Sequence, residues 1–239
     1  MGAAVSFDNK KKQAEFKLPP FPPTPTPTPT PSPSPSPQPA APHMFQEIIA
    51  TAPDSEEKNP DLASLEGKVY FLEENKKKYW VKNNKNHFML FPRGMSITWG
   101  NDPRYWAWKK QENGGTDDGI EVAELKDVCW LEVDGKMELS HLTPGVVYQV
   151  VFEVKMRKVC GGWSLPVNLR LKFPYGSVDQ ERKANLDDKP REEWLDLVVG
   201  EFKPQKGQRG NLLVSLFQFA GEWKKGLVIR GVRIVPKEP

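Results

Sequence analysis

Aromatic side chains are concentrated around one turn of the sequence, and their types and spacing suit sugar binding. Gly100–Pro103 carries a strong turn signal, so Trp99 is expected to end one strand and Trp106 to lie near the start of the next. Trp106 and Trp108 are two residues apart and should share a face, whereas Tyr105 takes the other. An indole offers a flat surface to the apolar C–H face of a pyranose, so this segment predicts a carbohydrate platform.

A sugar also presents hydroxyl and acetamido groups, which need directed hydrogen bonds. Asp102 and Arg104 lie in the same turn, and Glu222 lies in a later loop, so all three are candidate partners. Together with Trp99, Trp106, Tyr105 and Trp108 they form the predicted binding set. The alternative is that Trp99 and Trp106 only pack in the core, and the residues alone leave both interpretations open.

Motifs for catalysis or metal binding are absent from the sequence. The three histidines are far apart, and no H-E-x-x-H, C-x-x-C, G-x-S-x-G or phosphate-binding glycine loop occurs. Acidic pairs such as Asp117-Asp118 and Asp187-Asp188 fall in polar, turn-like stretches, where carboxylates are usually only solvated. We therefore expect a binding protein rather than an enzyme, with no cofactor and no metal.

Short apolar runs with a two-residue period predict an all-β domain. About ten strands at this spacing indicate an antiparallel β-sandwich of jelly-roll type. The alternation within 147–155 places Tyr148, Val150, Phe152 and Val154 towards the core. Single helical turns are considered for Pro60–Glu66 and Gln180–Ala184. The expected strands are Val69–Leu72, Lys78–Val81, Phe88–Phe91, Ser96–Trp99, Trp106–Lys109, Ile120–Leu125, Val128–Val133, Gly145–Met156, Val167–Phe173, Trp194–Phe202, Leu212–Phe219 and Leu227–Val235.

The first 65 residues form a different kind of segment from residues 66–239. They contain none of the eight tryptophans, and most of the 24 prolines fall between Pro19 and Pro42. Repeated Thr-Pro and Ser-Pro dipeptides favour an extended polyproline II arm, either a spacer or a carrier of PxxP ligands and phosphorylation sites. The apolar pair Ile48 and Ile49 can anchor this flexible region on the domain that follows.

The charge argues against a duplex-DNA reader, and the cysteine content points to a reducing compartment. The formal net charge is only +3, without the concentrated basic stripe of a duplex-DNA reader. With two cysteines, no secretory signal and no apolar run that could span a membrane, a nucleocytoplasmic rather than secreted location is expected. Cys160 precedes two glycines and is predicted to lie in an exposed turn, where oxidation could cross-link two chains.

The N-terminus matches an acylation pattern. Gly2 is followed by Ser6 at the position that N-myristoylation requires, and Lys10–Lys12 supply the basic cluster that usually assists a single acyl chain. Membrane association is expected only if Gly2 is lipidated.

A series of motifs resembles the phloem protein 2 family, in order and over about residues 66–239. These motifs are Phe88–Phe91, Ser96–Trp99, Tyr105–Trp108, Val128–Val133, Leu142–Gly145, Val147-Tyr148, Pro166–Leu169 and Trp223–Leu227. The resemblance implies a jelly-roll lectin domain, shared with the tobacco-type lectin Nictaba. It also implies binding of N-acetylglucosamine oligomers and N-glycan cores, in the cytoplasm, the nucleus and the phloem sap, with roles in defence or phloem transport.

The same resemblance assigns residues. The family's sugar-site tryptophans match Trp99 and Trp106, and Glu222 is the nearest match to a glutamate near the Trp-Lys-Lys-Gly motif. We therefore predict that Trp106→Ala abolishes chito-oligosaccharide binding while the fold stays intact. Some family members carry an F-box before this domain, but here a proline-rich arm stands in its place.

Two other functions remain open at this stage, besides a possible homodimer. One is single-stranded RNA binding, since the resemblance implies association with mobile RNAs and the aromatic platform is accompanied by lysines. The other is a structural role, because the family's phloem filaments cross-link with other phloem proteins through thiols, for which Cys160 is the better candidate. The lysines considered for RNA are Lys76–Lys78, Lys109, Lys110, Lys224 and Lys225.

Overall fold

The chain divides into two units in the computed structural model, Met1–Gln38 and Pro39–Pro239. The structure describes residues 1–4, 41–53, 60–61, 64–111, 117, 119–174 and 178–238. Lys10–Lys12 and all but the last two residues of the predicted arm Pro19–Pro42 lie outside these ranges. Every element below belongs to the second unit.

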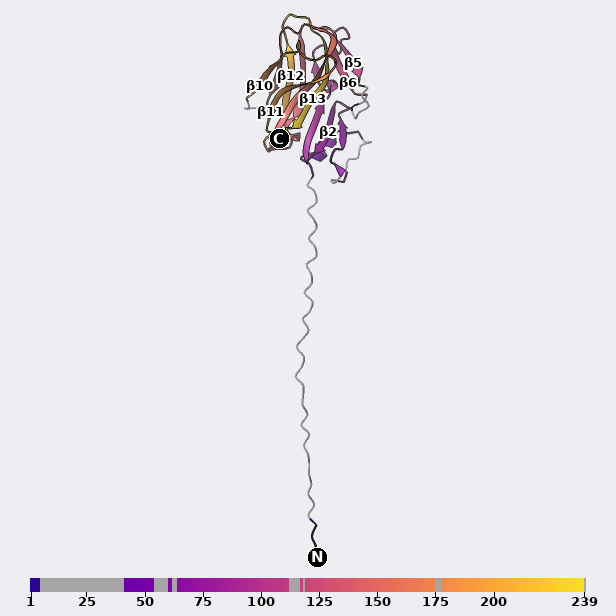
Figure 1. Ribbon diagram of the computed structural model, residues 1–239, viewed down its shortest axis with the longest axis vertical. Coiled ribbons are helices and arrows are strands. Elements are labelled where there is room, and N and C mark those ends of the chain that lie inside the picture. The colour runs from indigo at the N-terminus through magenta and orange to yellow at the C-terminus, as the bar shows by residue number, and fades with distance from the viewer. Residues whose placement is uncertain are drawn as a thin grey trace. The chain divides into compact units, whose positions relative to one another are not determined.

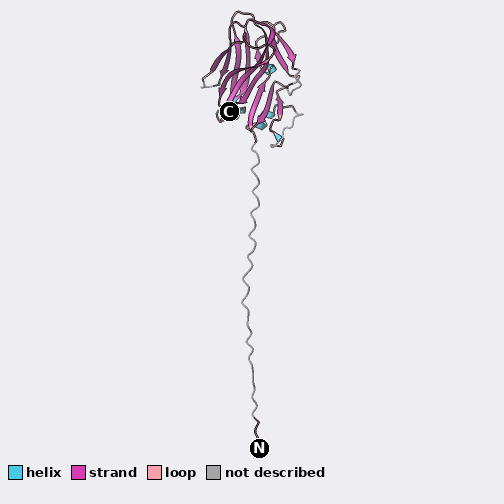
Figure 2. Ribbon diagram, in the orientation of Figure 1, coloured by secondary structure: helices cyan, strands magenta, loops and turns pink. Residues whose placement is uncertain are grey.

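The described elements are almost all strands (Figure 2). They are α1 (Phe45–Ile49), β1 (Val69–Leu72), β2 (Lys77–Lys82), β3 (Lys85–Leu90), β4 (Ser96–Ile97), β5 (Trp106–Lys110), β6 (Glu121–Leu125), β7 (Leu131–Glu138), β8 (Tyr148–Gly161), β9 (Val167–Lys172), β10 (Gln180–Ala184), β11 (Trp194–Phe202), β12 (Asn211–Gln218) and β13 (Lys225–Pro236). Short 3-10 turns occupy Pro92–Gly94 and Leu139–His141. The all-β class is confirmed.

The described strands form two antiparallel sheets (Figure 1). Sheet A has eight strands in the order β1-β2-β3-β13-β6-β5, with β8 also beside β13 and β11 beside β8. Sheet B has five strands in the order β10-β9-β12-β7-β4. From β6 onwards the chain crosses repeatedly between the sheets, which confirms the predicted sandwich with connections of the jelly-roll kind.

The core lies between the sheets and follows the two-residue period of the strands. Tyr148, Val150, Phe152 and Val154 on β8 all have 0% of their surface exposed, as predicted. β8 runs between β11 and the central strand β13 of sheet A. This continuous alternation explains why one face of β8 could be identified from sequence.

The folded unit begins before the predicted boundary at residue 65. Helix α1 buries Phe45, Ile48 and Ile49, and the ring centroid of Phe45 lies 5.8 Å from that of Tyr70. Ile48 and Ile49 therefore do anchor this segment. The helix is too short to show a clear periodic signal in a polar stretch, so sequence analysis missed it.

Gln180–Ala184 is an edge strand and not the helical turn that we considered. Its polar, charged composition suits either an exposed turn or an edge strand, because both face water. Pairing with β9 decides the outcome, and the Glu181 carboxylate accepts a hydrogen bond of 2.6 Å from Arg170 Nε across the two strands. The other candidate turn, Pro60–Glu66, is only partly within the described residues.

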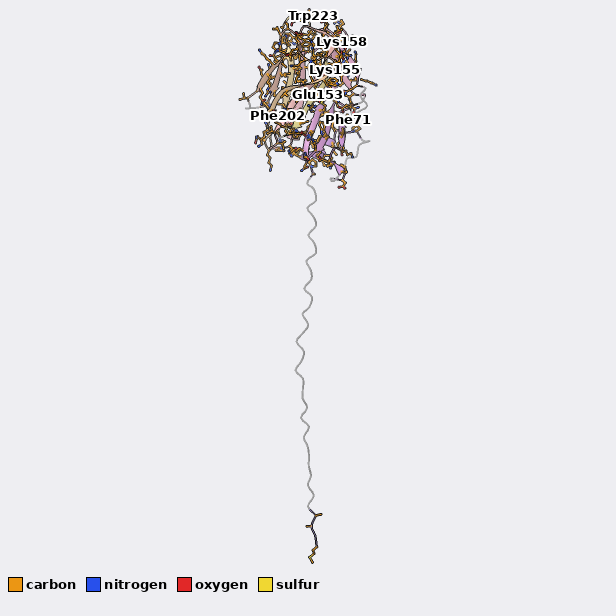
Figure 3. All side chains as sticks on the ribbon, in the orientation of Figure 1. Phe71, Glu153, Lys155, Lys158, Phe202 and Trp223 are labelled. Atoms are coloured by element: carbon orange, nitrogen blue, oxygen red, sulfur yellow. The ribbon has the colours of Figure 1, made fainter. Side chains whose placement is uncertain are left out.

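One end of the sandwich collects five loops, each of which crosses between the sheets; we call it the loop end. The loops are residues 98–105, 126–130, 162–166, 185–193 and 219–224. Six of the eight tryptophans lie in these loops or at the first residue of the strand that follows, namely Trp99, Trp106, Trp130, Trp163, Trp194 and Trp223. Figure 3 shows Trp223 at this end and Phe71 and Phe202 towards the other.

A buried lysine holds two of these loops together. Lys224 is 0% exposed, and its ammonium donates hydrogen bonds to the carbonyls of Cys129 (2.6 Å), Glu222 (2.8 Å) and Ala220 (3.1 Å). Burial lowers its pKa because the charged form is removed from water. Lys224 is therefore a structural residue, and its assignment to an RNA-binding surface is wrong.

Replacing this ammonium should loosen the loop end. We expect Lys224→Met to lower the free energy of unfolding by about 1.5–3 kcal/mol, the range for a hydrogen bond to a charged group. Urea denaturation would measure the change. Lys225→Met is the matched control, because Lys225 is exposed and should tolerate the change. Equal stability of the two variants would contradict the role of Lys224.

Trp106 belongs to the core and not to an open sugar platform. Its side chain is only 2% exposed, and the indole Nε1 donates to the carbonyl of Thr98 at 3.1 Å. A ring enclosed in this way cannot stack on a ligand, so the predicted stacking role of Trp106 is wrong. Trp106 is the first residue of β5, and its side chain points into the core. This is the alternative to sugar binding that the sequence left open.

Trp106→Ala should consequently damage the fold and not the surface. Removing a buried Trp side chain costs about 3–5 kcal/mol, because apolar contacts are lost and a cavity remains. We expect a loss of this size in chemical denaturation, and any loss of ligand binding should track the unfolded fraction. A Trp106→Ala variant of wild-type stability would refute this assignment.

Candidate functional site

The turn between β4 and β5, residues 98–105, holds an exposed tryptophan by means of an unusual backbone conformation. Trp99 has φ 58°, in the left-handed region that bulky residues rarely occupy, and 48% of its surface is exposed. Hydrogen bonds from Gly100 N to Ile97 O and from Asp102 N to Trp99 O, both 2.9 Å, enclose the residue. The surrounding turn therefore holds the Trp99 indole exposed to water, and the backbone of Trp99 is strained as a result. Such backbone strain is common at functional sites.

Little space remains for a side chain at Gly100, next to Trp99. A Cβ atom on Gly100 would lie 3.0 Å from both the Cβ and the carbonyl oxygen of Ile97. The turn is closed further by hydrogen bonds from Tyr105 N and Trp106 N to the carbonyl of Asp102, at 3.0 and 3.1 Å. The predicted turn is thus present, and it is tighter than its composition alone indicated.

Tyr105 lies beside Trp99 on the outside of the turn. The two ring centroids are 5.2 Å apart with an interplanar angle of 37°, and Tyr105 is half-buried. The guanidinium carbon of Arg104 lies 5.2 Å from the centroid of the Tyr105 ring. The structure therefore brings together the three predicted residues Trp99, Arg104 and Tyr105.

Asp102 and Arg104 bind each other. Arg104 donates from Nη2 to Asp102 Oδ2 at 2.6 Å and from Nε to Oδ1 at 3.0 Å, and its backbone N–H also donates to Oδ1. These hydrogen bonds lower the pKa of Asp102 and raise that of Arg104. The two side chains use several of their hydrogen-bonding groups on each other, which stiffens the turn. Only their remaining donors and acceptors can therefore bind a ligand.

Trp108 supports the turn from behind. Its Nε1 donates to the carbonyl of Gly100 at 2.8 Å, and the guanidinium of Arg93 covers its ring at 3.6 Å from the centroid. Arg93 is in turn held by Glu121 at 2.7 Å. Because its ring face is covered by an arginine, Trp108 is a positioning residue and not a second platform.

A shallow hollow opens beside Trp99. It has a volume of about 550 Å³ and is lined by Ile97, Trp99, Gly100, Asn101, Asp102 and Pro103. Asn101 is exposed and offers both a donor and an acceptor. The sequence analysis did not select Asn101, although its place in the turn beside the aromatic residues was a usable signal.

Glu222 is at the loop end, but the hydrogen bond of its carboxylate within the described residues goes to Ser164 and not to the Trp99 turn. Its Oε1 accepts a hydrogen bond of 2.6 Å from the Ser164 hydroxyl, and its Oε2 is buried without a hydrogen-bond partner among the residues that the structure describes. An unsatisfied carboxylate oxygen of this kind is costly. Its predicted role in sugar binding stays a prediction.

Lysines predicted for RNA binding are largely occupied by acidic partners. Lys76 and Lys77 pair with Glu74 and Glu73 at 3.3 and 2.7 Å. Lys78 pairs with Asp117, and Lys109 pairs with Glu124 at 2.8 Å. Since Lys224 is buried, Lys110 and Lys225 are the two of this set that lie exposed and have no ion pair within the described part of the chain.

Cys160 lies inside β8 and not in an exposed turn. It is half-buried and packs against the core, and a Cβ atom on Gly226 would lie 2.7 Å from the Cys160 Cβ. The predicted exposure of the thiol is therefore wrong, whereas the cross-link itself stays a prediction. Cys129 is also half-buried, and its Sγ lies 3.6 Å from the Ala220 carbonyl oxygen.

The described ranges contain neither a candidate metal centre nor a candidate membrane-spanning helix. No group of three or more His, Cys, Asp and Glu side chains there is arranged to hold a metal ion. The helices in those ranges are not long and apolar enough to cross a bilayer.

Proteins similar in sequence to this chain bear the names phloem protein or lectin. A protein named Phloem Protein 2-Like A1 from Arabidopsis thaliana is 44% identical over 177 residues, which is 73% of this chain and 72% of that protein. A lectin from Luffa acutangula is 45% identical over 172 residues, 70% of this chain and 80% of the lectin. The structure of a carbohydrate-binding module of a Zobellia galactanivorans laminarinase matches with 11% identity and a TM-score of 0.37, over 64% of this chain and all of the module.

A family model described as Phloem protein 2 matches residues 85–236. This range runs from β3 to the end of β13 and includes the Trp99 turn. The resemblance found in the sequence motifs is thereby confirmed. The chain belongs to the phloem protein 2 family.

Proposed function

We propose that this chain is a non-catalytic lectin that binds N-acetylglucosamine oligomers, including chito-oligosaccharides and N-glycan cores, at the Trp99 turn. One observation carries the proposal: the turn holds the Trp99 indole 48% exposed in a strained backbone conformation, beside an open hollow. A folded protein retains such an arrangement more readily when the exposed ring has a binding role.

The binding mode that we propose is stacking with a few directed hydrogen bonds. When the apolar face of the sugar stacks on the Trp99 indole, both surfaces are removed from water. This burial contributes about 25 cal/mol of binding free energy for each Å² of apolar surface. Asn101 and the outer edge of the Asp102–Arg104 pair are then in place for hydroxyl and acetamido groups. Each such hydrogen bond adds only about 0.5–1.5 kcal/mol, so one sugar should bind weakly.

Relatives support this proposal. The protein from Luffa acutangula and a second one from Coccinia grandis, 34% identical over 149 residues, both bear the name lectin. The preference for N-acetylglucosamine comes from the family resemblance of the motifs around the turn. RNA binding is disfavoured, because most of the lysines considered for it are paired or buried.

Trp99→Gly should separate binding from stability. The left-handed conformation costs residues other than glycine about 1–2 kcal/mol, and glycine adopts it without strain. Relief of this strain should offset the stability lost with the contacts of the Trp99 ring. We expect the variant to stay within about 1 kcal/mol of wild-type stability while its affinity for chitotriose falls at least about tenfold, equal to 1.4 kcal/mol. Calorimetric titration would measure the affinity and thermal denaturation the fold. Undiminished binding would refute the site.

Salt dependence should distinguish a sugar from a nucleic acid. A protein that makes six to ten phosphate contacts loses affinity by about 10³–10⁵ between roughly 50 and 200 mM salt, because counterions are released. Affinity for a neutral oligosaccharide should change less than about twofold over this range. We expect the weak dependence, measured on a glycan array and with a single-stranded RNA at both concentrations. RNA binding that is tighter than glycan binding at the higher salt would favour the other function.

A further inference from the structure

Three aromatic rings lie together on the outer face of sheet B at the loop end; we call them the outer aromatic cluster. They are Trp130, Phe217 and Phe219. The Trp130 and Phe219 ring centroids are 4.1 Å apart with an interplanar angle of 22°, and those of Phe217 and Phe219 are 5.1 Å apart. Trp130 is 45% and Phe219 41% exposed. The residue pattern of Val128–Val133 predicts a strand but does not indicate this cluster.

Strand register explains why these rings meet. Phe217 on β12 lies opposite Glu132 on β7, and both point away from the buried neighbours Leu216 and Val133. Trp130 comes two residues before Glu132, and Phe219 two residues after Phe217, so the two-residue period brings all of them to the outer face. The rings therefore form a row that begins on the sheet and ends in the loops.

Glu132 connects this cluster to the Trp99 turn. Its Oε2 accepts hydrogen bonds from Thr98 Oγ1 at 3.1 Å and from Trp130 Nε1 at 3.2 Å. The Thr98 backbone N–H also donates to the Glu132 carbonyl at 3.0 Å. Thr98 directly precedes Trp99, so one carboxylate oxygen joins the two exposed tryptophan sites through single hydrogen bonds.

Charge on this surface indicates which ligands suit it. Glu132 forms no ion pair with any cation in the described ranges, so its negative charge is not neutralised there. Arg170, which lies 4.5 Å from the Phe217 centroid, is bound to Glu181 at 2.6 Å. A carboxylate beside open rings accepts hydrogen bonds from hydroxyl and amide groups and repels phosphates. The surface therefore favours a neutral, hydroxyl-rich ligand over a nucleic acid.

Packing alone does not account for the cluster. Rings that serve only the core become enclosed, as Trp106 does at 2% exposure. Trp130 and Phe219 stack on each other and still leave close to half of their surface open. Open apolar surface rimmed by polar groups marks binding sites on soluble proteins.

We propose that the outer aromatic cluster is a second stacking subsite, which continues the site at the Trp99 turn across Glu132. One neutral oligosaccharide chain would then place one sugar on Trp99 and a later sugar on Trp130 and Phe219. This inference rests on the proposed function, and it adds that one oligomer contacts two aromatic surfaces of the loop end at the same time. Glu132 lies between the two subsites and accepts hydrogen bonds from the connecting part of the ligand.

Chain length is the variable that tests this proposal. The affinities of the full-length protein for the mono-, di-, tri- and tetrasaccharide of N-acetylglucosamine are measured by calorimetric titration. In the wild type we expect affinity to rise with length. In Trp130→Ala the affinity for the tetrasaccharide should fall about tenfold, equal to about 1.4 kcal/mol, while that for the monosaccharide stays unchanged. Trp130→Phe keeps an aromatic ring and should retain most of the affinity.

Matched variants exclude trivial causes. Trp223 is 58% exposed at the same end but outside the cluster, so Trp223→Ala should bind all lengths as the wild type does. Thermal denaturation confirms that each variant is folded, and Phe219→Ala gives the same readout if Trp130→Ala does not fold.

The outcomes separate the two proposals. If the folded wild type binds no oligomer of any length, both the lectin function and this subsite are wrong. If the wild type binds and Trp99→Gly abolishes binding, but Trp130→Ala and Phe219→Ala leave the length dependence intact, only the second subsite is wrong. An equal loss at all lengths in Trp130→Ala would also contradict a separate subsite.

Discussion

Hydrogen bonds from buried side chains to loop carbonyls are the interaction on which the loop end depends. Five loops cross between the sheets there, and their backbone groups lack the partners that strands provide. Indole N–H groups supply two of them, since Trp106 donates to Thr98 O at 3.1 Å and Trp108 donates to Gly100 O at 2.8 Å. Trp163, itself in a loop, donates to the carbonyl of Lys225 at the start of β13 at 3.0 Å. The ammonium of Lys224 supplies three more. Tryptophan serves this purpose because one large apolar ring fills the core and carries one donor.

This use of tryptophan divides the residues of the loop end into two groups. Trp106 and Trp163 are 2% exposed and hold loops in place, whereas Trp99, Trp130 and Trp223 are 45–58% exposed and face water. The first group makes the second possible, because a turn braced by Trp106 and Trp108 can keep Trp99 at a positive φ. Without that bracing the turn would relax and the Trp99 ring could fold back onto apolar surface. Rigid support of this kind is what a stacking site needs, since an ordered ring loses little entropy when it binds.

The sequence predicted the fold much better than it predicted the exposure of the rings. β1 and β11 have the predicted bounds, and the inward face of β8 is correct, because alternation along a strand reports burial directly. Trp99 and Trp106 flank a turn, where alternation stops and the local φ decides which ring is open. Lys224 likewise appears as one of two adjacent lysines, and only the meeting of loops from distant strands shows that it is buried. These failures are tertiary effects that local patterns do not contain.

The charges around the aromatic surface of the loop end restrict the classes of ligand that it can bind. Residues 66–239 carry a net positive charge, which by itself would suit a polyanion. The open rings, however, are accompanied by Glu132 and by the Asp102–Arg104 pair, which is neutral overall. The cations Lys77, Lys78 and Lys109 lie on strands of sheet A, where each forms an ion pair with a carboxylate. The arginines beside the open rings, Arg104 and Arg170, are bound to Asp102 and Glu181, whereas single-stranded nucleic acids require free positive charge and aromatic surface in one groove. The aromatic surface of the loop end is consequently suited to uncharged chains that carry hydroxyl and amide groups.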